Sequence, residues 1–125
     1  MKISIITLSC DNLDYTKAFV TSIRQNTFLT YELIIVDNGS ESATQKWVKE
    51  NADKSLIFPE NKGFSKGFNE GMKIAKGDYV MMANNDTEFP PDWDKKLVDI
   101  IEINPGAGIV TPVYTSGRKS ALRTE

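Results

Sequence analysis

The chain of 125 residues contains no histidine and a single cysteine, Cys10. The lack of histidine excludes Ser-His-Asp and Cys-His catalysis, zinc sites built on histidine, and acid/base chemistry by imidazole. Proton transfer and metal binding must therefore rely on Asp and Glu side chains. With one cysteine the chain cannot form an internal disulfide, which favours a reducing compartment.

A long apolar run and an excess of basic charge are also missing. The apolar run from Ile3 to Leu8 is too short for a signal peptide, and no other stretch approaches membrane-spanning length. The formal net charge is −2, which argues against nucleic acid as a partner. We therefore expect a cytoplasmic protein without a transmembrane segment, which could work at the inner face of the membrane.

The length and composition are those of one ordinary globular domain. Hydrophobic residues make up 40% of the chain and charged residues 26%. A chain of 125 residues is long enough for one core and too short for two. We therefore treat residues 1–125 as a single domain.

Short apolar, β-branched runs alternate with amphipathic segments along the chain. This alternation predicts an α/β fold with a mostly parallel sheet. The third strand is expected at a sheet edge because Pro59 closes it, and the fourth is expected to be buried and central. The predicted strands are 3–8, 33–36, 55–58, 79–83 and 108–114, and the predicted helices are 13–26, 42–51, 64–75 and 91–103, followed by a polar tail at 115–125.

Local signals refine the predicted helices. Ser42 with Gln45 three residues later indicates a capping box, and Gly77 is expected to stop the preceding helix at its C′ position. Gly67 and Gly71 inside that helix cost roughly 1–2 kcal/mol of helix propensity, which suggests close approach to the sheet or to a ligand. The residues expected to face the core are Tyr15, Phe19 and Ile23, then Phe64, Phe68, Met72 and Ala75, and finally Trp93, Leu97, Ile100 and Ile101.

Clusters of short polar residues follow the first, second and fourth strands. The carboxyl ends of parallel strands meet at one sheet edge, where open α/β folds bind ligands. Turn statistics alone would explain one such cluster, but three together favour a ligand cleft. The clusters are Ser9-Cys10-Asp11-Asn12, Asp37-Asn38-Gly39-Ser40 and Asn84-Asn85-Asp86.

With further motifs, these clusters resemble the family 2 glycosyltransferases of the GT-A fold. The motifs are Asp37-Asn38-Gly39-Ser40, Asn61-Lys62-Gly63-Phe64-Ser65 with Asn69 and Gly71, Gly77-Asp78-Tyr79 and Asn84-Asn85-Asp86, and the resemblance runs from Ile3 to about Val113. The Asn-Asn-Asp sequence resembles the rhamnosyltransferase-like branch. The resemblance implies a GT-A-type, Rossmann-like three-layer sandwich with a mostly parallel sheet. It also implies an inverting transferase that takes a UDP- or dTDP-sugar with Mg²⁺ or Mn²⁺ and glycosylates a saccharide or cell-surface polysaccharide acceptor.

The resemblance also implies roles for individual residues. Mg²⁺ commonly takes one or two carboxylates plus substrate phosphates, and the cation offsets charge on the leaving diphosphate. Because Asn84 stands where the motif has its first acid, we expect weak metal binding without the nucleotide. The implied roles are Thr7 and Ser9 lining the nucleotide pocket, Asp37 accepting the ring N–H of uracil or thymine, Asn61 and Gly63 along the nucleotide, Asn69 pointing toward the site, Asn84 and Asn85 binding substrate, and Asp86 binding the metal.

Simpler interpretations stand beside these roles. Asp37 could cap the turn before the next helix, and Asp86 could merely end a strand. Asn61 and Gly63 could be turn residues, and Asn69 could satisfy buried backbone. The sequence also favours Trp93 as a core anchor over a sugar platform, and Cys10 as an inert small residue.

The catalytic base is not identified. Without histidine it must be a carboxylate, and Asp92 and Asp94 are better explained as helix N-terminal charges. The resemblance implies a base beyond the metal motif, so we expect an N-terminal donor-binding portion that lacks the acceptor-binding part. Apolar surface exposed by that truncation could support a homodimer.

Two other functions remain open. The first is a nucleotide-sugar-binding or regulatory domain without turnover. The second is a phosphoacceptor receiver domain, which needs paired acids after the first strand and a lysine ending the last. Here the corresponding positions are Ser9-Cys10-Asp11 and Val113-Tyr114-Thr115, which argues against it.

Overall fold

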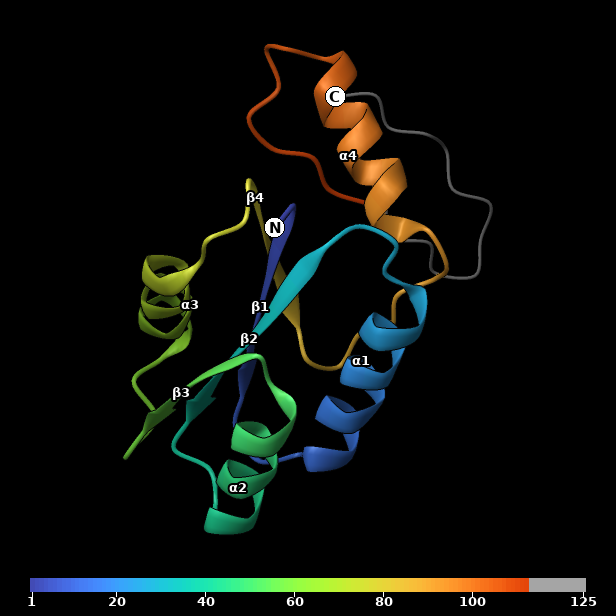
Figure 1. The fold of residues 1–125 in the computed structure, drawn as a ribbon. Helices are drawn as coiled ribbons and strands as arrows, with labels where there is room; N and C mark the ends of the chain where they lie inside the picture. The colour runs from blue at the N-terminus through green and yellow to red at the C-terminus, as the bar shows by residue number, and fades with distance from the viewer. Residues whose placement is uncertain (113–125) are drawn as a thin grey trace, which may run out of the picture.

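The computed structural model describes residues 1–112, which form four strands and four helices in alternation (Figure 1). The predicted tail at 115–125 lies outside the described residues. The elements are β1 (Ile3–Ser9), α1 (Leu13–Asn26), β2 (Tyr31–Asn38), α2 (Ser42–Asn51), β3 (Lys54–Phe58), α3 (Phe64–Ile74), β4 (Tyr79–Asn84) and α4 (Trp93–Ile103).

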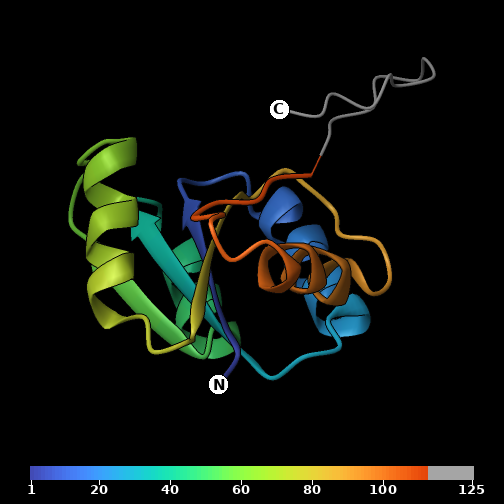
Figure 2. The same cartoon turned by 90° about the horizontal axis from the view of Figure 1, so that it is seen from above.

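The strands form one parallel sheet in the order β3-β2-β1-β4. The prediction of a parallel α/β fold with the third strand at an edge is therefore confirmed. Helix α3 covers one face of the sheet, and α1, α2 and α4 lie on the other, which gives three layers (Figure 2).

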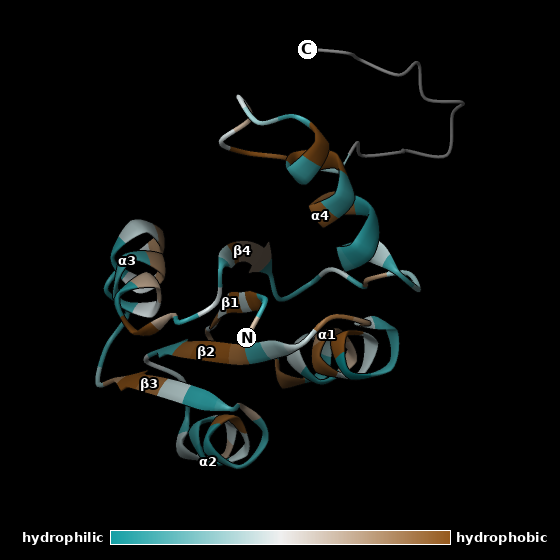
Figure 3. Cartoon of the chain, turned by 45° about the horizontal axis from the view of Figure 1, so that its top comes forward, coloured by the Kyte–Doolittle hydropathy of each residue, from teal (hydrophilic) through white to brown (hydrophobic). Residues whose placement is uncertain are grey.

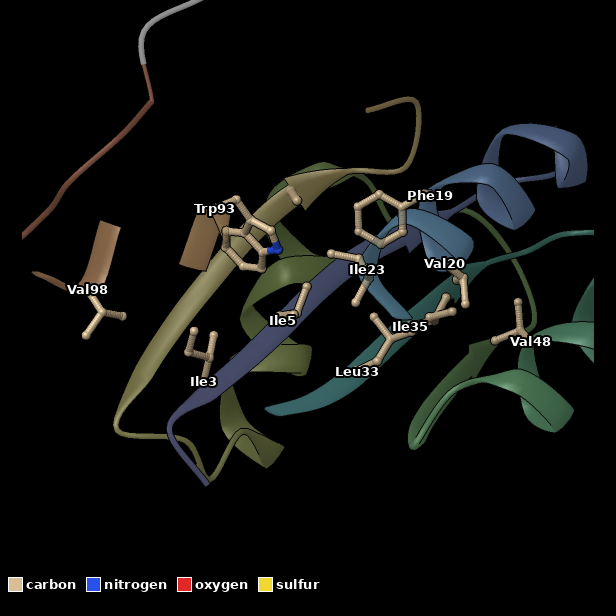
Figure 4. Packing of buried hydrophobic residues seen from close by; sticks show 11 residues of the cluster. Ile3, Ile5, Phe19, Val20, Ile23, Leu33, Ile35, Val48, Trp93 and Val98 are labelled. Atoms are coloured by element: carbon tan, nitrogen blue, oxygen red, sulfur yellow. The ribbon is translucent and has the colours of Figure 1, made fainter. Parts of the chain in front are cut away.

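The larger core lies between the sheet and helices α1, α2 and α4. Ile5 of β1 and Ile35 of β2 are fully buried there, and Trp93 of α4 packs into the same cluster (Figure 4). The helices show hydrophobic and hydrophilic sides in Figure 3, as an amphipathic helix on a sheet must. The buried members of this core are Ile3, Ile5, Phe19, Val20, Ile23, Leu33, Ile35, Val48, Ala83, Trp93 and Val98.

The smaller core joins α3 to the opposite face through Ile6, Ile34, Val36 and Phe68. Its packing depends on the glycines of α3. A Cβ on Gly71 would lie 2.7 Å from Ile6 Cγ2, and one on Gly67 would lie 2.7 Å from Leu8 Cδ2. The predicted close approach of this helix to the sheet is confirmed.

Strand β4 differs from its prediction as a buried, central strand. It forms an edge of the described sheet, with 46% of Val80 and 56% of Met82 exposed. Both side chains share a face with Ile6, because Val80 and Met82 are register partners of Ser4 and Ile6 on β1. Helix α3 packs mainly on β1 and β2, so the same face of β4 stays open.

Two predicted helix signals act differently in the structure. Helix α2 begins at Ser42, but its N-cap residue is Glu41 and no side chain caps it; Gln45 Nε2 instead donates to the Ser40 carbonyl at 2.9 Å. Gly77 lies beyond the C-cap residue Ala75, and its φ is not positive. A Cβ on Gly77 would lie 2.5 Å from Ser4 N, so close packing rather than helix termination requires glycine there.

Several residues expected in the core are exposed, and one predicted strand does not form in its described part. The described part of the predicted last strand, 108–112, is irregular, and Ile109 is 88% exposed; residues 113 and 114 lie outside the described residues. The exposed residues that were expected inside are Tyr15, Phe64, Met72 and Ile100.

No helix within residues 1–112 has the length and apolarity needed to cross a membrane.

Candidate functional site

The carboxyl ends of β1, β2 and β4 lie side by side at one edge of the sheet. Ser9 is the register partner of Asp37, and Leu8 is the partner of Asn84 on the other side of β1. With strands about 4.8 Å apart, the ends of β2 and β4 are about 10 Å apart. The expectation that the three polar clusters meet at one edge is confirmed.

Three buried oxygen atoms at this edge have no hydrogen-bond partner within residues 1–112. They are Thr7 Oγ1, Ser9 Oγ and Asp37 Oδ2, and all three residues are fully buried. Thr7, Ser9 and Asp37 share the sheet face on which Ile5 and Ile35 are buried, because side chains alternate along a strand. Buried polar atoms are rarely left unpaired, and an ordered water molecule or a ligand group is the usual partner of such atoms.

The other oxygen of Asp37 stabilises the turn that follows β2. Asp37 Oδ1 accepts a hydrogen bond from Ser40 N at 2.9 Å, and Ser40 Oγ accepts one from Asp11 N at 2.7 Å. Asp11 Oδ1 in turn accepts one from Glu41 N at 3.0 Å. Asp37 therefore does stabilise its turn, as the simpler interpretation holds, and its Oδ2 has no partner among the described residues.

The loop containing Asn61 and Gly63 lies against both neighbouring loops. Asn61 Nδ2 is 3.7 Å from Cys10 Sγ, and Asn61 Oδ1 accepts a hydrogen bond from Gly63 N at 2.8 Å. A Cβ on Gly39 would lie 2.7 Å from Asn61 N, so only glycine allows this approach. Asn61, Gly63 and Cys10 are exposed at the same edge as Ser9 and Asp37.

The turn after β4 carries the candidate metal ligand. Asp86 and Asn84 are exposed, while Asn85 Nδ2 donates a hydrogen bond to Thr16 Oγ1 of α1 at 3.0 Å. Within the described residues, no three acidic or thiol side chains cluster as a metal site. The single carboxylate of Asp86 suits a cation that takes its remaining ligands from phosphates and water.

Asn69 is not brought to the other candidates. It is exposed on α3, about half a helical turn away from Gly67 and Gly71, which face the sheet. No hydrogen bond of its side chain is found within residues 1–112, so the structure gives no sign that it satisfies buried backbone.

Trp93 and Asp94 anchor α4 rather than serving the site. Trp93 is buried and donates from Nε1 to Thr27 Oγ1 at 3.1 Å, which agrees with its interpretation as a core anchor. Asp94 is fully buried, and its Oδ2 accepts hydrogen bonds from Phe28 N at 3.0 Å and Leu29 N at 2.6 Å. Asp94 lies in the first turn of α4, as expected for a helix N-terminal charge, and it also fixes the α1–β2 loop.

Sequence reasoning missed Asn38 as more than a turn residue. Asn38 is 4% exposed, and its amide contacts the backbone of Lys62 and Gly63. Its place at the end of a buried strand was the available signal, but its partner segment lies more than twenty residues later in the chain.

Two surface cavities lie away from these residues. One, of about 710 Å³, is at the opposite end of the sheet, where β2 and β3 begin. The other, of about 620 Å³, lies between α1 and α2. Neither is lined by any of the candidate site residues named above.

Comparisons with known proteins identify the family to which the chain is similar. The sequence pattern of Glycosyl transferase family 2 matches residues 4–125. A glucosyl-dolichyl phosphate glucuronosyltransferase from Haloferax volcanii is 31% identical over 126 aligned residues, which cover 93% of this chain and 40% of that protein.

Solved structures show the same fold at lower identity. Staphylococcus aureus TarS 1-349 in complex with UDP-GlcNAc has a TM-score of 0.74 and 21% identity, over 89% of this chain and 37% of the other. The mannosyltransferase PcManGT from Pyrobaculum calidifontis, in complex with GDP-Man and Mn²⁺, has a TM-score of 0.73 and 17% identity, over 80% of this chain and 32% of the other.

The chain spans about 40% of the length of the first curated relative. The family match nevertheless covers nearly all of this chain, and the structure has the α/β, GT-A-like fold that the resemblance implied. On these findings, the chain belongs to glycosyltransferase family 2, as part of a GT-A glycosyltransferase domain.

Proposed function

We propose that this chain binds the nucleotide-diphosphate part of a UDP- or dTDP-sugar at the carboxyl edge of its sheet. It would thereby form the donor-binding part of an inverting glycosyltransferase. The acceptor would be a saccharide or a cell-surface polysaccharide. The Asn84-Asn85-Asp86 sequence is the reason to include the rhamnosyltransferase-like branch in the proposal.

The observation that carries the proposal is the set of unpartnered oxygens of Thr7, Ser9 and Asp37. A carboxylate oxygen without a donor costs free energy when buried. The ring N–H of uracil or thymine would satisfy it once the loops at this edge open to admit the base, because Asp37 is fully buried here. Asp37 Oδ1 is already held by Ser40 N, so the orientation of the carboxylate is fixed before a ligand arrives. Such preorganisation raises affinity, since less freedom is lost on binding.

Asp86 would hold Mg²⁺ or Mn²⁺ together with the donor's phosphates. Its carboxylate is exposed, and an amide rather than an acid stands at Asn84. When bound, the cation would supply positive charge that stabilises the departing diphosphate. Because this chain contributes one carboxylate, metal and nucleotide are expected to bind together and each weakly alone.

Relatives support the ligand class. The TarS structure was determined with UDP-GlcNAc, and the PcManGT structure with GDP-Man and Mn²⁺. We carry over to this chain the nucleotide-diphosphate-sugar class and the divalent cation. The pyrimidine preference rests on Asp37 alone.

Calorimetric titration with UDP, dTDP and GDP tests the base-binding role. The native chain should bind UDP or dTDP in Mn²⁺ more tightly than GDP. In Asp37→Asn the Ser40 contact can persist while an N–H₂ group replaces the accepting oxygen, so UDP should bind about 10–100-fold more weakly.

Asp94→Asn is the matched control, because Asp94 is also fully buried with one unpartnered oxygen, yet it lies at the opposite end of the sheet. It should lower stability and leave the UDP affinity unchanged. Failure of the native chain to bind any of the three nucleotides would overturn the proposal. Tighter binding of GDP would overturn the pyrimidine preference alone.

The metal role is tested by the same titration in Mn²⁺ and in EDTA. Asp86→Ala should remove the gain in UDP affinity that Mn²⁺ gives the native chain. Asp99→Ala, which removes an exposed carboxylate on α4, should keep that gain. Equal Mn²⁺ dependence in the native and Asp86→Ala chains would rule out this ligand.

The other candidate is a nucleotide-sugar-binding domain without turnover. Asp94 accepts hydrogen bonds from two backbone N–H groups, which removes one carboxylate from the possible catalytic bases. Binding of a UDP-sugar, with no sugar transferred to any saccharide acceptor, would support this alternative over the transferase.

A further inference from the structure

The side-chain amide of Asn38 forms two hydrogen bonds with the loop that follows β3. Asn38 Oδ1 accepts from Lys62 N at 2.8 Å, and Asn38 Nδ2 donates to the Gly63 carbonyl at 3.1 Å. Asn38 is the last residue of β2 and is 4% exposed. The amide therefore pairs with the loop as a backbone peptide group would.

The loop depends on this contact because its own backbone is unusual. Gly63 has φ 88° and ψ 169°, a conformation open essentially to glycine alone. The Gly63 carbonyl also accepts the first hydrogen bond of α3, from Gly67 N at 3.2 Å. Asn38 thus fixes both the entry to α3 and the peptide next to Asn61.

Asn38 acts on the site from the other side of the sheet. Successive side chains of β2 point to opposite faces, so Asn38 lies on the α3 face while Asp37 lies on the α1 face. Asp37 is the residue proposed to contact the base, and Asn61 and Gly63 are those proposed to lie along the nucleotide. Asn38 therefore connects the loop that contains Asn61 and Gly63 to the end of β2, directly after Asp37.

We infer that Asn38 is a positioning residue that holds the Asn61–Gly63 loop as one wall of the nucleotide site. This inference rests on the proposed function. Asn38 does not itself contact the nucleotide; it acts through the loop. Asparagine suits this place because the contact requires one acceptor and one donor, which alanine lacks and an ionised aspartate only half supplies.

The experiment compares the native chain with Asn38→Ala and with the matched control Asn51→Ala. Asn51 also donates from Nδ2 to a backbone carbonyl, that of Trp47 at 2.8 Å, but at the far end of α2. UDP affinity in Mn²⁺ should fall about tenfold in Asn38→Ala, the size typical of losing a contact behind a binding group, and stay unchanged in Asn51→Ala. Amide hydrogen exchange should quicken at Lys62 and Gly63 in Asn38→Ala only.

A double-mutant cycle with Asn61→Ala separates positioning from a general loss of stability. If Asn38 acts through the loop, the two losses of UDP affinity should be clearly less than additive, whereas independent effects would add. If Asn38→Ala does not fold, Asn38→Asp replaces it in every arm, since it keeps the acceptor for Lys62 N and loses the donor to Gly63. It should likewise weaken UDP binding at pH 7.

The outcomes distinguish this role from the proposed function. If the native chain binds UDP, but Asn38→Ala and Asn38→Asp bind it as well as the native chain, the positioning role is wrong and the donor site stands. Additive losses in the cycle would also overturn the role. If the native chain binds no nucleotide, the proposed function falls and this inference falls with it.

Discussion

Asn85 donates a hydrogen bond from Nδ2 to Thr16 Oγ1 at 3.0 Å, which ties the turn after β4 to helix α1. Thr16 is fully buried, and Asn85 stands directly before the candidate metal ligand Asp86. The expected role of Asn85 in substrate binding stays a prediction, and its amide nitrogen already has a partner within the protein. The turn that carries Asp86 is therefore tied to α1 through the residue before it.

Replacing Thr16 with valine should loosen this turn with almost no change in shape. The substitution leaves the partly buried Asn85 amide without its acceptor, so the free energy of unfolding should fall by about 1 kcal/mol. The Mn²⁺-dependent part of UDP binding should weaken as well. Urea unfolding and calorimetry measure the two effects, with the exposed Thr21→Val on the same helix as control. Unchanged Mn²⁺ dependence in Thr16→Val would separate the turn from the metal.

At the opposite end of the sheet, Glu32 joins three parts of the chain. Its side chain is 3% exposed; Oε2 lies 2.7 Å from Lys54 Nζ, and Oε1 accepts hydrogen bonds from Ser4 Oγ at 2.6 Å and Lys76 N at 2.7 Å. Burial would raise the pKa of Glu32, but these hydrogen bonds and the charge of Lys54 hold the pKa below its usual range.

Stability should therefore fall in acid through Glu32. A carboxyl whose pKa is lower in the folded chain stabilises the fold above its unfolded pKa of about 4.3, and this contribution is lost as pH falls through the folded pKa. Glu32→Gln should lose about 3 kcal/mol at pH 7 and show a flatter decline of stability between pH 5 and 3. Urea unfolding across this pH range measures both. Glu50→Gln, which breaks an exposed pair with Lys46, should have little effect. A native-like acid dependence in Glu32→Gln would contradict this explanation.

Gly77 should tolerate no side chain. An added Cβ would lie 2.5 Å from Ser4 N and 2.7 Å from the Ile3 carbonyl carbon, and these are backbone atoms that cannot rotate away. Gly77→Ala should therefore destabilise the fold by at least about 1–3 kcal/mol, the usual cost of overpacking. Gly106→Ala, where no atom lies within 4 Å of the added Cβ, should be close to neutral. Thermal unfolding compares the two, and equal melting temperatures would refute the packing role.

Cys10 offers a chemical probe of the site. It is exposed and lies 3.7 Å from Asn61 Nδ2, beside the loops proposed to hold the nucleotide. UDP with Mn²⁺ should slow its reaction with a thiol reagent several-fold, because the bound nucleotide would cover the loop after β1. The control is the same assay on Asp37→Asn, in which protection should require far more UDP. Full reactivity at saturating UDP would place the nucleotide elsewhere.

The fold could be predicted because its signals are local. Each strand is a short apolar run, and each helix has its own apolar stripe. The sequence therefore predicts the alternation of strands and helices that is typical of a parallel α/β sheet. Signals that depend on neighbours were less reliable. Val80 and Met82 read as buried because they are apolar, but burial depends on what covers β4. Gly77 was predicted to stop the helix before it. Glycine is required there because a side chain would clash with the backbone of Ser4, which is far away in sequence.

The candidate site divides in the same way. The meeting of Ser9, Asp37 and Asn84 at one edge follows from parallel strands, and so it could be predicted. The contacts that fix the loops could not, since Asn38 with Lys62 and Asn85 with Thr16 join segments distant in sequence. Residues that only form a turn and residues that position a site are of the same types, such as Asn, Asp and Gly. Only their long-range contacts distinguish them.

The central claim is that a nucleotide diphosphate binds at the carboxyl edge of the sheet, and mapping of backbone amide shifts by NMR during titration with UDP and Mg²⁺ tests it most directly. The account predicts that the largest shifts fall in residues 9–12, 37–41, 60–63 and 84–87. Shifts confined to residues 27–31 and 53–54, which line the cavity of about 710 Å³ at the opposite end, would contradict it.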